Sequence, residues 1–537
     1  MPIPPSIAGA VALLGGLGCL SFFCSLRWLA RKMVTFERGR WGLLLAVCGT
    51  GILVFGIRLV IAEGQVSWMP YLDQWEAEIG GMVAPLAHGT LTAGDLFAAN
   101  NEHRVILTRV VSLAVVELNG AWDNRITIVG MFILQSATAA WICAIAWIYL
   151  GWARGSLVGA AVVLPMFLIC DWENIVSGFQ DQFGFMILGS VVVFSMSDRY
   201  SLKSVDGWAV LVMALLLLGS MASGLLTAAV MVWAGLMGAM AGRRGWKTTA
   251  GFCAACAAIA ALGWFTRNHA AQSPALYAQG LHAWWRAFLA YSAWPLPPNV
   301  PGFLCLWLPW FILLAQTLRR REARPFALFS LALGLWVLLQ AGGLAWSRAG
   351  LSGLVSARYT EVVSLGFVAN AAALVFLLSS VRISGKTAIA SWTAMAIWLA
   401  MIGRYEVWRS HAIYRPYFKD FRHQTLEQEQ RVGTFVRTGD ASVIERAQFP
   451  QIPDQAEIIL PLLRDPLLQP LLPAPLRREF VRDRNPAELL LIKNGPLSFI
   501  AIRALRNGLG FILIGLALLG VAFIWTRRTV VPAPPAR

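Results

Sequence analysis

The stretch WGLLLAVCGTGILVFGIRLVIA fills residues 41–62 of the chain. It is long and apolar enough to cross a bilayer, which takes about 20 residues in an α-helix. Similar runs recur along most of the 537 residues, of which 58% are hydrophobic and only 13% are charged. This composition excludes an ordinary soluble globular protein. The sequence therefore predicts an all-α polytopic membrane protein.

The apolar runs predict about 13 transmembrane helices. The expected spans are residues 6–26, 41–62, 126–150, 155–170, 182–197, 207–222, 224–241, 248–265, 302–318, 325–345, 359–381, 387–403 and 501–526. Alternate loops are basic, as at Arg199 with Lys203 and at Arg319–Arg321. Because cytoplasmic loops carry the excess of Lys and Arg, these loops place the N-terminus outside. The net charge of +16 then reflects loops that face anionic lipid, and no nucleic acid partner is expected.

This topology predicts the organisation of the chain. Residues 1–403 form a transmembrane module, with outside loops at 63–125 and 266–301. Residues 404–500, mixed in charge and rich in proline, form a small outside domain that leans on the membrane part for stability. Residues 501–537 supply the last transmembrane helix and a cytoplasmic tail.

Rare charges gather in the first outside loop, between Trp68 and Arg109. Apolar residues at helical spacing predict an amphipathic helix along the membrane surface, which Pro85 kinks or ends. They are Trp75, Ile79, Met82, Val83 and Leu86. The run Val105–Val116 is too short to span and predicts a second interfacial helix. The loop is thus expected to form the floor of a site outside the membrane.

Asp73 stands at the start of the first of these helices. A carboxylate at a membrane–water boundary is partly desolvated, which tunes its pKa for general base catalysis. The alternative is a helix cap, because Asp73 and Glu76 have the spacing of a capping box. The two interpretations are compatible, since a capped carboxylate is also a fixed one.

Basic residues on the outer side form the second candidate group. Arg104, Arg358 and His103 lie where the charge rule depletes basic residues, and arginine supplies the fixed donors that phosphate recognition needs. The alternative is snorkelling to lipid headgroups. In a third polar patch, Glu173 and Gln180 suit either hydroxyl-rich ligands or simple helix ends.

Four short motifs accompany this layout: Tyr71-Leu-Asp-Gln-Trp75, Asn101-Glu-His-Arg104, Glu173-Asn-Ile-Val-Ser-Gly-Phe-Gln180 and Ala357-Arg-Tyr359. Together they resemble a bacterial group of the GT-C glycosyltransferase superfamily. The resemblance in layout covers most of the chain. It implies a polyprenyl-phosphate sugar donor and transfer by inversion outside the cytoplasm, with the catalytic acid of the first outside loop at Asp73. Many members carry adjacent acids there, whereas this chain has Asp73-Gln-Trp-Glu76.

The expected function is a glycosyltransferase of the bacterial inner membrane that acts on its periplasmic face. Asp73 is the expected base, and the acceptor is a glycan, a lipid or a protein. The expected donor phosphate contacts are His103, Arg104 and Arg358, and the expected sugar or acceptor contacts are Glu76, Glu102, Glu173 and Gln180. No cofactor is expected and no metal-ligand spacing is present, although GT-C members differ in their use of a divalent metal.

Two alternatives stay open. A transporter or flippase for lipid-linked glycans predicts internal repeats and charged residues buried in the middle of the spans, and neither is evident in the sequence. An O-antigen ligase or polymerase would place its essential loop later in the chain.

Overall fold

The computed structural model of the chain describes residues 4–34, 39–243, 245–268, 274–350, 355–381, 384–445, 455–477 and 495–529. Within these ranges every regular element is a helix, and the β structure is limited to one isolated bridge between Asn100 and His103. The predicted all-α class is therefore confirmed for the described part of the chain.

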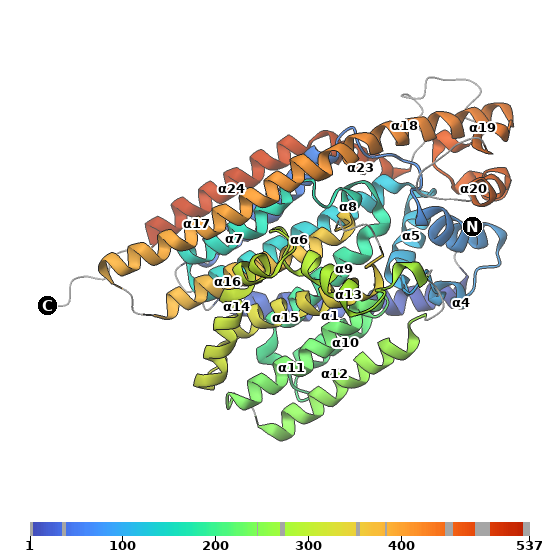
Figure 1. The fold of residues 1–537 in the computed structure, drawn as a ribbon. Helices are drawn as coiled ribbons and strands as arrows, with labels where there is room; N and C mark the ends of the chain where they lie inside the picture. Colours follow the sequence, from blue (N-terminus) through green and yellow to red (C-terminus); the bar gives the residue numbers. More distant parts are fainter. Residues whose placement is uncertain are drawn as a thin grey trace.

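Ten helical runs in the described ranges are long and apolar enough to cross a membrane, which makes this a multi-pass membrane protein. They contain α1 (Pro5–Val34), α2 (Arg40–Ala62), α6 (Asn124–Leu150), α11 (Leu225–Met240), α12 (Trp246–Thr266), α14 (Val300–Arg320), α15 (Pro325–Ser347), α16 (Ala357–Ser380), α17 (Gly385–Arg409) and α24 (Gly508–Thr529). The long helices α6, α17 and α24 lie roughly parallel (Figure 1).

Three of the expected spans are shorter helices: α7 (Trp152–Met166), α9 (Asp181–Ser195) and α10 (Val205–Leu217). They have 15, 15 and 13 residues. At 1.5 Å per residue they reach only about 20–23 Å, less than the roughly 30 Å hydrocarbon core. The structure therefore supports ten candidate spans rather than the expected count of about 13.

The remaining helices are short or lie in the segments predicted to be outside. They are η1 (Gln74–Val83), α3 (Ala84–His88), α4 (Ala93–Phe97), α5 (Ile106–Asn119), α8 (Trp172–Val176), η2 (Gly178–Gln180), η3 (Ser197–Arg199), η4 (Ala222–Gly224), η5 (Pro274–Leu276), α13 (Leu281–Ser292), η6 (Ser410–Tyr414), α18 (Arg415–Thr438), α19 (Ser442–Glu445), α20 (Gln455–Arg464), η7 (Gln469–Leu471), η8 (Ala474–Leu476) and α23 (Pro496–Arg506). Figure 1 shows α4, α5, α19 and α20 together at one end of the molecule.

The two helices predicted in the first outside loop are present as η1 with α3 and as α5. Pro85 lies in α3, directly after the π-helical η1, and the helical run continues past it to His88. The apolar face does not lie on a membrane surface. Trp75 and Ile79 are fully buried in a cluster that includes Phe435 and Leu463 from the C-terminal segment.

The segments predicted to be outside contact one another. The Arg104 Nε donates to the Thr266 carbonyl oxygen over 3.1 Å, which joins the first loop to the end of α12. The Trp122 N–H donates to the Leu471 carbonyl oxygen over 2.9 Å, and this bond joins the first loop to the C-terminal segment. Residues of 404–500 therefore share a hydrophobic core with the first loop.

Glycines allow α24 to pack closely against α2. Gly42, Gly49 and Gly56 recur every seven residues on α2 and meet α24. A Cβ at Gly56 would lie 2.6 Å from the Ile512 nitrogen, and a Cβ at Gly515 would lie 2.6 Å from the Leu53 nitrogen. Small residues of this kind let helix backbones approach within a membrane.

Candidate functional site

Asp73 occupies the N-cap position of η1, but its side chain accepts no capping hydrogen bond. The expected capping role is therefore absent, and Glu76 is exposed one turn further on. Burial raises the pKa of Asp73, the positive charge of Arg358 opposes this rise, and the negative charge of Glu102 adds to it. A carboxylate with a raised pKa and no hydrogen-bond donor among the described residues is suited to accept a proton.

Arg358 lies in the first turn of α16 and pairs with Glu173 of α8. Its Nε is 3.0 Å from the Glu173 Oε2 and donates a longer bond of 3.4 Å to the Ser356 Oγ. The Ser356 hydroxyl in turn donates to the other Glu173 oxygen over 3.1 Å. The two terminal nitrogens of Arg358 donate to none of the described residues. Glu173 thus orients the guanidinium through Nε and leaves the terminal pair available to an anionic ligand.

A second pair, Glu102 with Arg348, braces the same region. The Arg348 guanidinium is 2.8 Å from the Glu102 Oε1 and donates to the Tyr359 hydroxyl over 3.1 Å. It also donates to the Ser347 carbonyl oxygen over 2.9 Å. Every nitrogen of Arg348 therefore has a partner within the protein, in contrast to Arg358. Arg348 joins the first loop to the ends of α15 and α16.

His103 contacts Glu102 at the edge of this brace. Its Nε2 is 3.5 Å from the Glu102 Oε1, and its Nδ1 accepts a bond of 3.2 Å from the Ala222 N–H. Burial lowers the pKa of His103 to about 4, although Glu102 counteracts part of the shift. The imidazole is therefore neutral near pH 7, with its proton on Nε2 because Nδ1 is an acceptor. A neutral ring can donate a hydrogen bond to a phosphate but carries no charge to pair with it.

The other expected site residues lie outside this group. The Arg104 side chain donates to the carbonyl oxygens of Thr266 and Phe97, over 3.1 and 2.6 Å. Its contacts hold the loop together and do not reach the Arg358 pair. Gln180 is buried in η2, and its Oε1 has no hydrogen-bond donor among the described residues.

A buried polar layer lies beneath the Arg358–Glu173 pair. Arg58 of α2 is fully buried, pairs with Asp171 and donates from Nε to the Gln135 Oε1 over 2.9 Å. The Gln135 amide nitrogen donates to the Glu361 Oε2 over 3.1 Å. The Asn174 amide nitrogen bonds the same Glu361 oxygen over 2.9 Å and the Arg358 carbonyl oxygen over 3.2 Å. The layer therefore reaches the backbone of the site arginine.

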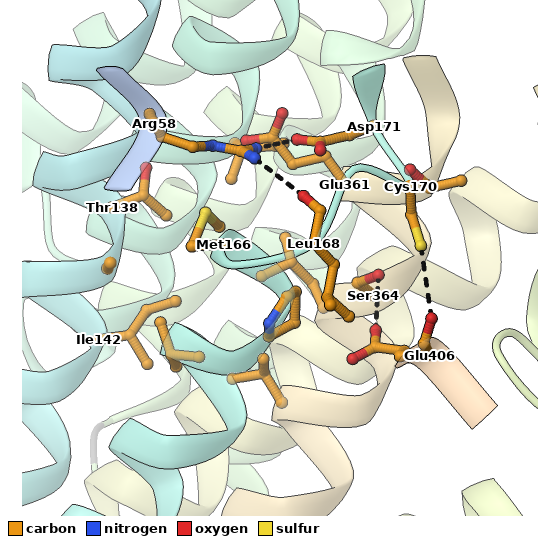
Figure 2. A pocket seen from close by; sticks show the side chains of 17 residues that line it. Arg58, Thr138, Ile142, Met166, Leu168, Cys170, Asp171, Glu361, Ser364 and Glu406 are labelled. Atoms are coloured by element: carbon orange, nitrogen blue, oxygen red, sulfur yellow. Dashed lines mark hydrogen bonds and ion pairs between the residues drawn. The ribbon is translucent and has the colours of Figure 1, made fainter. Parts of the chain in front are cut away.

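Figure 2 shows a cavity that is lined by Arg58, Asp171 and Glu361 of this layer, together with Ser364 and Glu406. The cavity leaves about 30 Å³ for solvent, room for about two water molecules. Three charged residues, Arg58, Glu361 and Glu406, are buried in α2, α16 and α17, each close to one end of its helix rather than in the middle of a span. The sequence signal for this buried layer was Arg58, a lone charged residue in an otherwise apolar span, because such residues mark a functional site or a buried partner.

In the described part of the chain, no group of three or more His, Cys, Asp or Glu side chains is arranged to hold a metal ion. The expectation that the reaction needs no cofactor stays a prediction. The arrangement can supply a base at Asp73, a neutral donor at His103, and a cation at Arg358 whose terminal nitrogens have no partner among the described residues.

No protein-family model matches the chain, and a comparison with curated proteins finds no significant match. The arrangement of Asp73, Arg358 and Glu173 therefore carries the functional inference, together with the apolar helices that surround it.

Proposed function

We propose that this protein is a membrane glycosyltransferase of the GT-C type. It moves a sugar from a polyprenyl-phosphate donor to an acceptor hydroxyl on the periplasmic face of a bacterial inner membrane. In this proposal the three shorter helices α7, α9 and α10 complete a module of about 13 membrane-embedded helices. Residues 404–500 form its outside part.

One observation carries the proposal. Asp73 has a raised pKa and no capping bond, and it lies within reach of the charge of Arg358, whose terminal nitrogens are unpaired among the described residues. The charge of Arg358 thus acts on the proposed base, and Arg358 itself lies in the first turn of the apolar helix α16. A lipid phosphate can reach such a site from the membrane, and an acceptor can reach it from water.

The chemistry needs no nucleotide. Asp73 takes the proton of the acceptor hydroxyl while the oxygen of that hydroxyl attacks the anomeric carbon of the donor sugar. The bond between that carbon and the phosphate oxygen breaks, and its electron pair stays on the departing polyprenyl phosphate. The phosphate gains one negative charge, which Arg358 stabilises as it develops. Attack from the face opposite the leaving group inverts the anomeric configuration.

The test uses the purified full chain with a panel of radiolabelled polyprenyl-phosphate hexoses and pentoses and a cell-envelope extract as acceptor. We expect free polyprenyl phosphate to appear with at least one donor. Asp73→Asn should remain folded, because no capping bond is lost, and should lose roughly 10²- to 10⁴-fold in rate. Full activity in this variant would refute the assignment of the base.

A lipid-linked glycan transporter is the second candidate, and the buried Arg58–Asp171–Glu361 layer favours it. In that case the donor lipid changes leaflet without loss of its sugar. A vesicle assay separates the two, since only a transferase releases free polyprenyl phosphate. An O-antigen ligase or polymerase has no separate observation in its favour.

A further inference from the structure

The three site residues come from chain segments that are far apart in sequence, yet one helical run passes all three. Asp73 directly precedes η1, Glu173 lies in α8, and Arg358 is in the first turn of α16. The run is α17, the π-helical turn η6 and α18, which continue without a break from Gly385 to Thr438.

Ser410 and Phe421 of this run contact the segment that carries Glu173. The Ser410 hydroxyl accepts a bond of 3.2 Å from the Ile169 N–H. The Phe421 ring lies 5.3 Å from the Trp172 ring, centroid to centroid. Trp172 is the residue directly before Glu173, so these contacts fix the start of α8.

Tyr414 contacts the segment that carries Arg358. Its hydroxyl donates to the Val355 carbonyl oxygen over 2.6 Å, three residues before the arginine. Tyr414 is 4% exposed and packs edge-on against Trp294, with ring centroids 5.7 Å apart. The bond therefore fixes the entry to α16 from a rigid position.

Phe421 also contacts the segment that carries Asp73. Its ring meets Tyr71 edge-on, with centroids 4.9 Å apart. Further along α18, the Glu429 carboxylate accepts a bond of 2.6 Å from the Ser67 hydroxyl. Phe421 therefore contacts both the segment that carries Asp73 and the segment that carries Glu173.

We propose that Tyr414 and Phe421 are positioning residues, which hold the Arg358–Glu173 pair at a fixed separation from the Asp73 carboxyl. The inference rests on the proposed function only for the roles given to Asp73 and Arg358. Neither positioning residue touches the reacting atoms. Each acts through the segment that it contacts.

The effect of Arg358 on the ionisation of Asp73 can be measured without any substrate, and it depends on the separation of the two groups. A carbodiimide with an amine labels protonated carboxyl groups, and peptide mass spectrometry follows the labelling of Asp73 against pH in the purified full chain. Two charged groups act on Asp73, Arg358 of α16 and Glu102 of the first loop. If Tyr414→Phe lets Arg358 withdraw, the labelling midpoint moves to higher pH by on the order of one unit. Phe421→Leu should move it the same way, and Arg358→Gln gives the reference shift.

Tyr417→Phe is the matched control, because Tyr417 lies on the same helical run and is 53% exposed. It loses the same hydroxyl and should leave the midpoint unchanged. If Tyr414→Phe and Phe421→Leu both melt as the wild type does and keep its midpoint, the positioning role is wrong. If either variant fails to fold, the other decides the question. Should the midpoints shift while no donor releases polyprenyl phosphate, the positioning stands and the proposed function fails.

Discussion

Arg358 pairs with Glu173 through its Nε, at 3.0 Å, and its two terminal nitrogens have no hydrogen-bond partner among the described residues. Arg348, ten residues earlier, instead uses all three nitrogens within the protein. This contrast supports the proposed ligand-binding role of Arg358, whereas Arg348 joins parts of the protein to one another. A guanidinium held through Nε presents its terminal nitrogens as a planar fork, which matches two phosphate oxygens.

The first prediction concerns this fork. Arg358→Lys keeps the positive charge but loses the planar pair of donors, so binding of a short-chain prenyl phosphate should weaken roughly 10- to 100-fold. Calorimetry on the detergent-solubilised protein measures it. Arg104→Lys is the control, because Arg104 bonds only backbone carbonyls in the described part of the chain. Equal losses in the two variants would show that Arg358 has no special role.

The second prediction concerns the acidic limb of the pH–rate profile, which reports the ionisation of Asp73. The negative charge of Glu102 helps to raise the pKa of Asp73. Glu102→Gln removes that charge, so the ionised base becomes easier to form and the acidic limb should move to lower pH. Glu117→Gln, an exposed position on α5, should leave the limb in place. A shift to higher pH in Glu102→Gln would contradict the proposed coupling.

The third prediction concerns stability and pH. Glu78 of η1 is fully buried, and burial raises its pKa to about 7, although Ser112 and Gln74 donate hydrogen bonds to it. The folded protein then binds more protons here than the unfolded chain does between pH 4.5 and 7. Stability from this group is complete below pH 4.5 and is lost as the pH rises through 7, by on the order of 3 kcal/mol.

Glu78→Gln stays neutral at every pH and retains an amide that fits the site. Its free energy of unfolding should therefore fall less than that of the wild type between pH 4.5 and 8. His103, whose lowered pKa acts with the opposite sign between pH 4 and 6.5, is present in both proteins and cancels in the comparison. Identical pH dependence in the two proteins would show that Glu78 does not titrate in this range.

The sequence supports part of this picture directly. All ten candidate spans of the described residues were predicted from apolar runs long enough to cross a bilayer, because hydropathy is a local property of the chain. The helix after Asp73 followed from the helical spacing of its apolar residues, and the helix around Arg109 followed from an apolar run too short to span. Their burial against α18 and α20 did not, since a 3.6-residue period shows an apolar face but not what covers it.

The two ion pairs of the candidate site could not be predicted from the sequence. Glu173 meets Arg358 and Glu102 meets Arg348 across 185 and 246 residues (358 − 173 and 348 − 102), and no local pattern encodes such a contact. Phe421 was equally hidden, because its neighbours Tyr71 and Trp172 come from distant segments. The glycine repeat on α2 was visible in the sequence as a seven-residue spacing and gives the last prediction.

The fourth prediction concerns the contact between α2 and α24. A methyl group at Gly515 would lie 2.6 Å from the Leu53 nitrogen, so Gly515→Ala must separate two closely packed backbones. Overpacking of this kind typically costs about 1–3 kcal/mol. Gly510→Ala is the matched control on the same helix, since no atom lies within 4 Å of its added carbon. Thermal unfolding in detergent should show a lower midpoint for Gly515→Ala. The control should melt at or slightly above the wild-type midpoint, because Ala favours a helix more than Gly does.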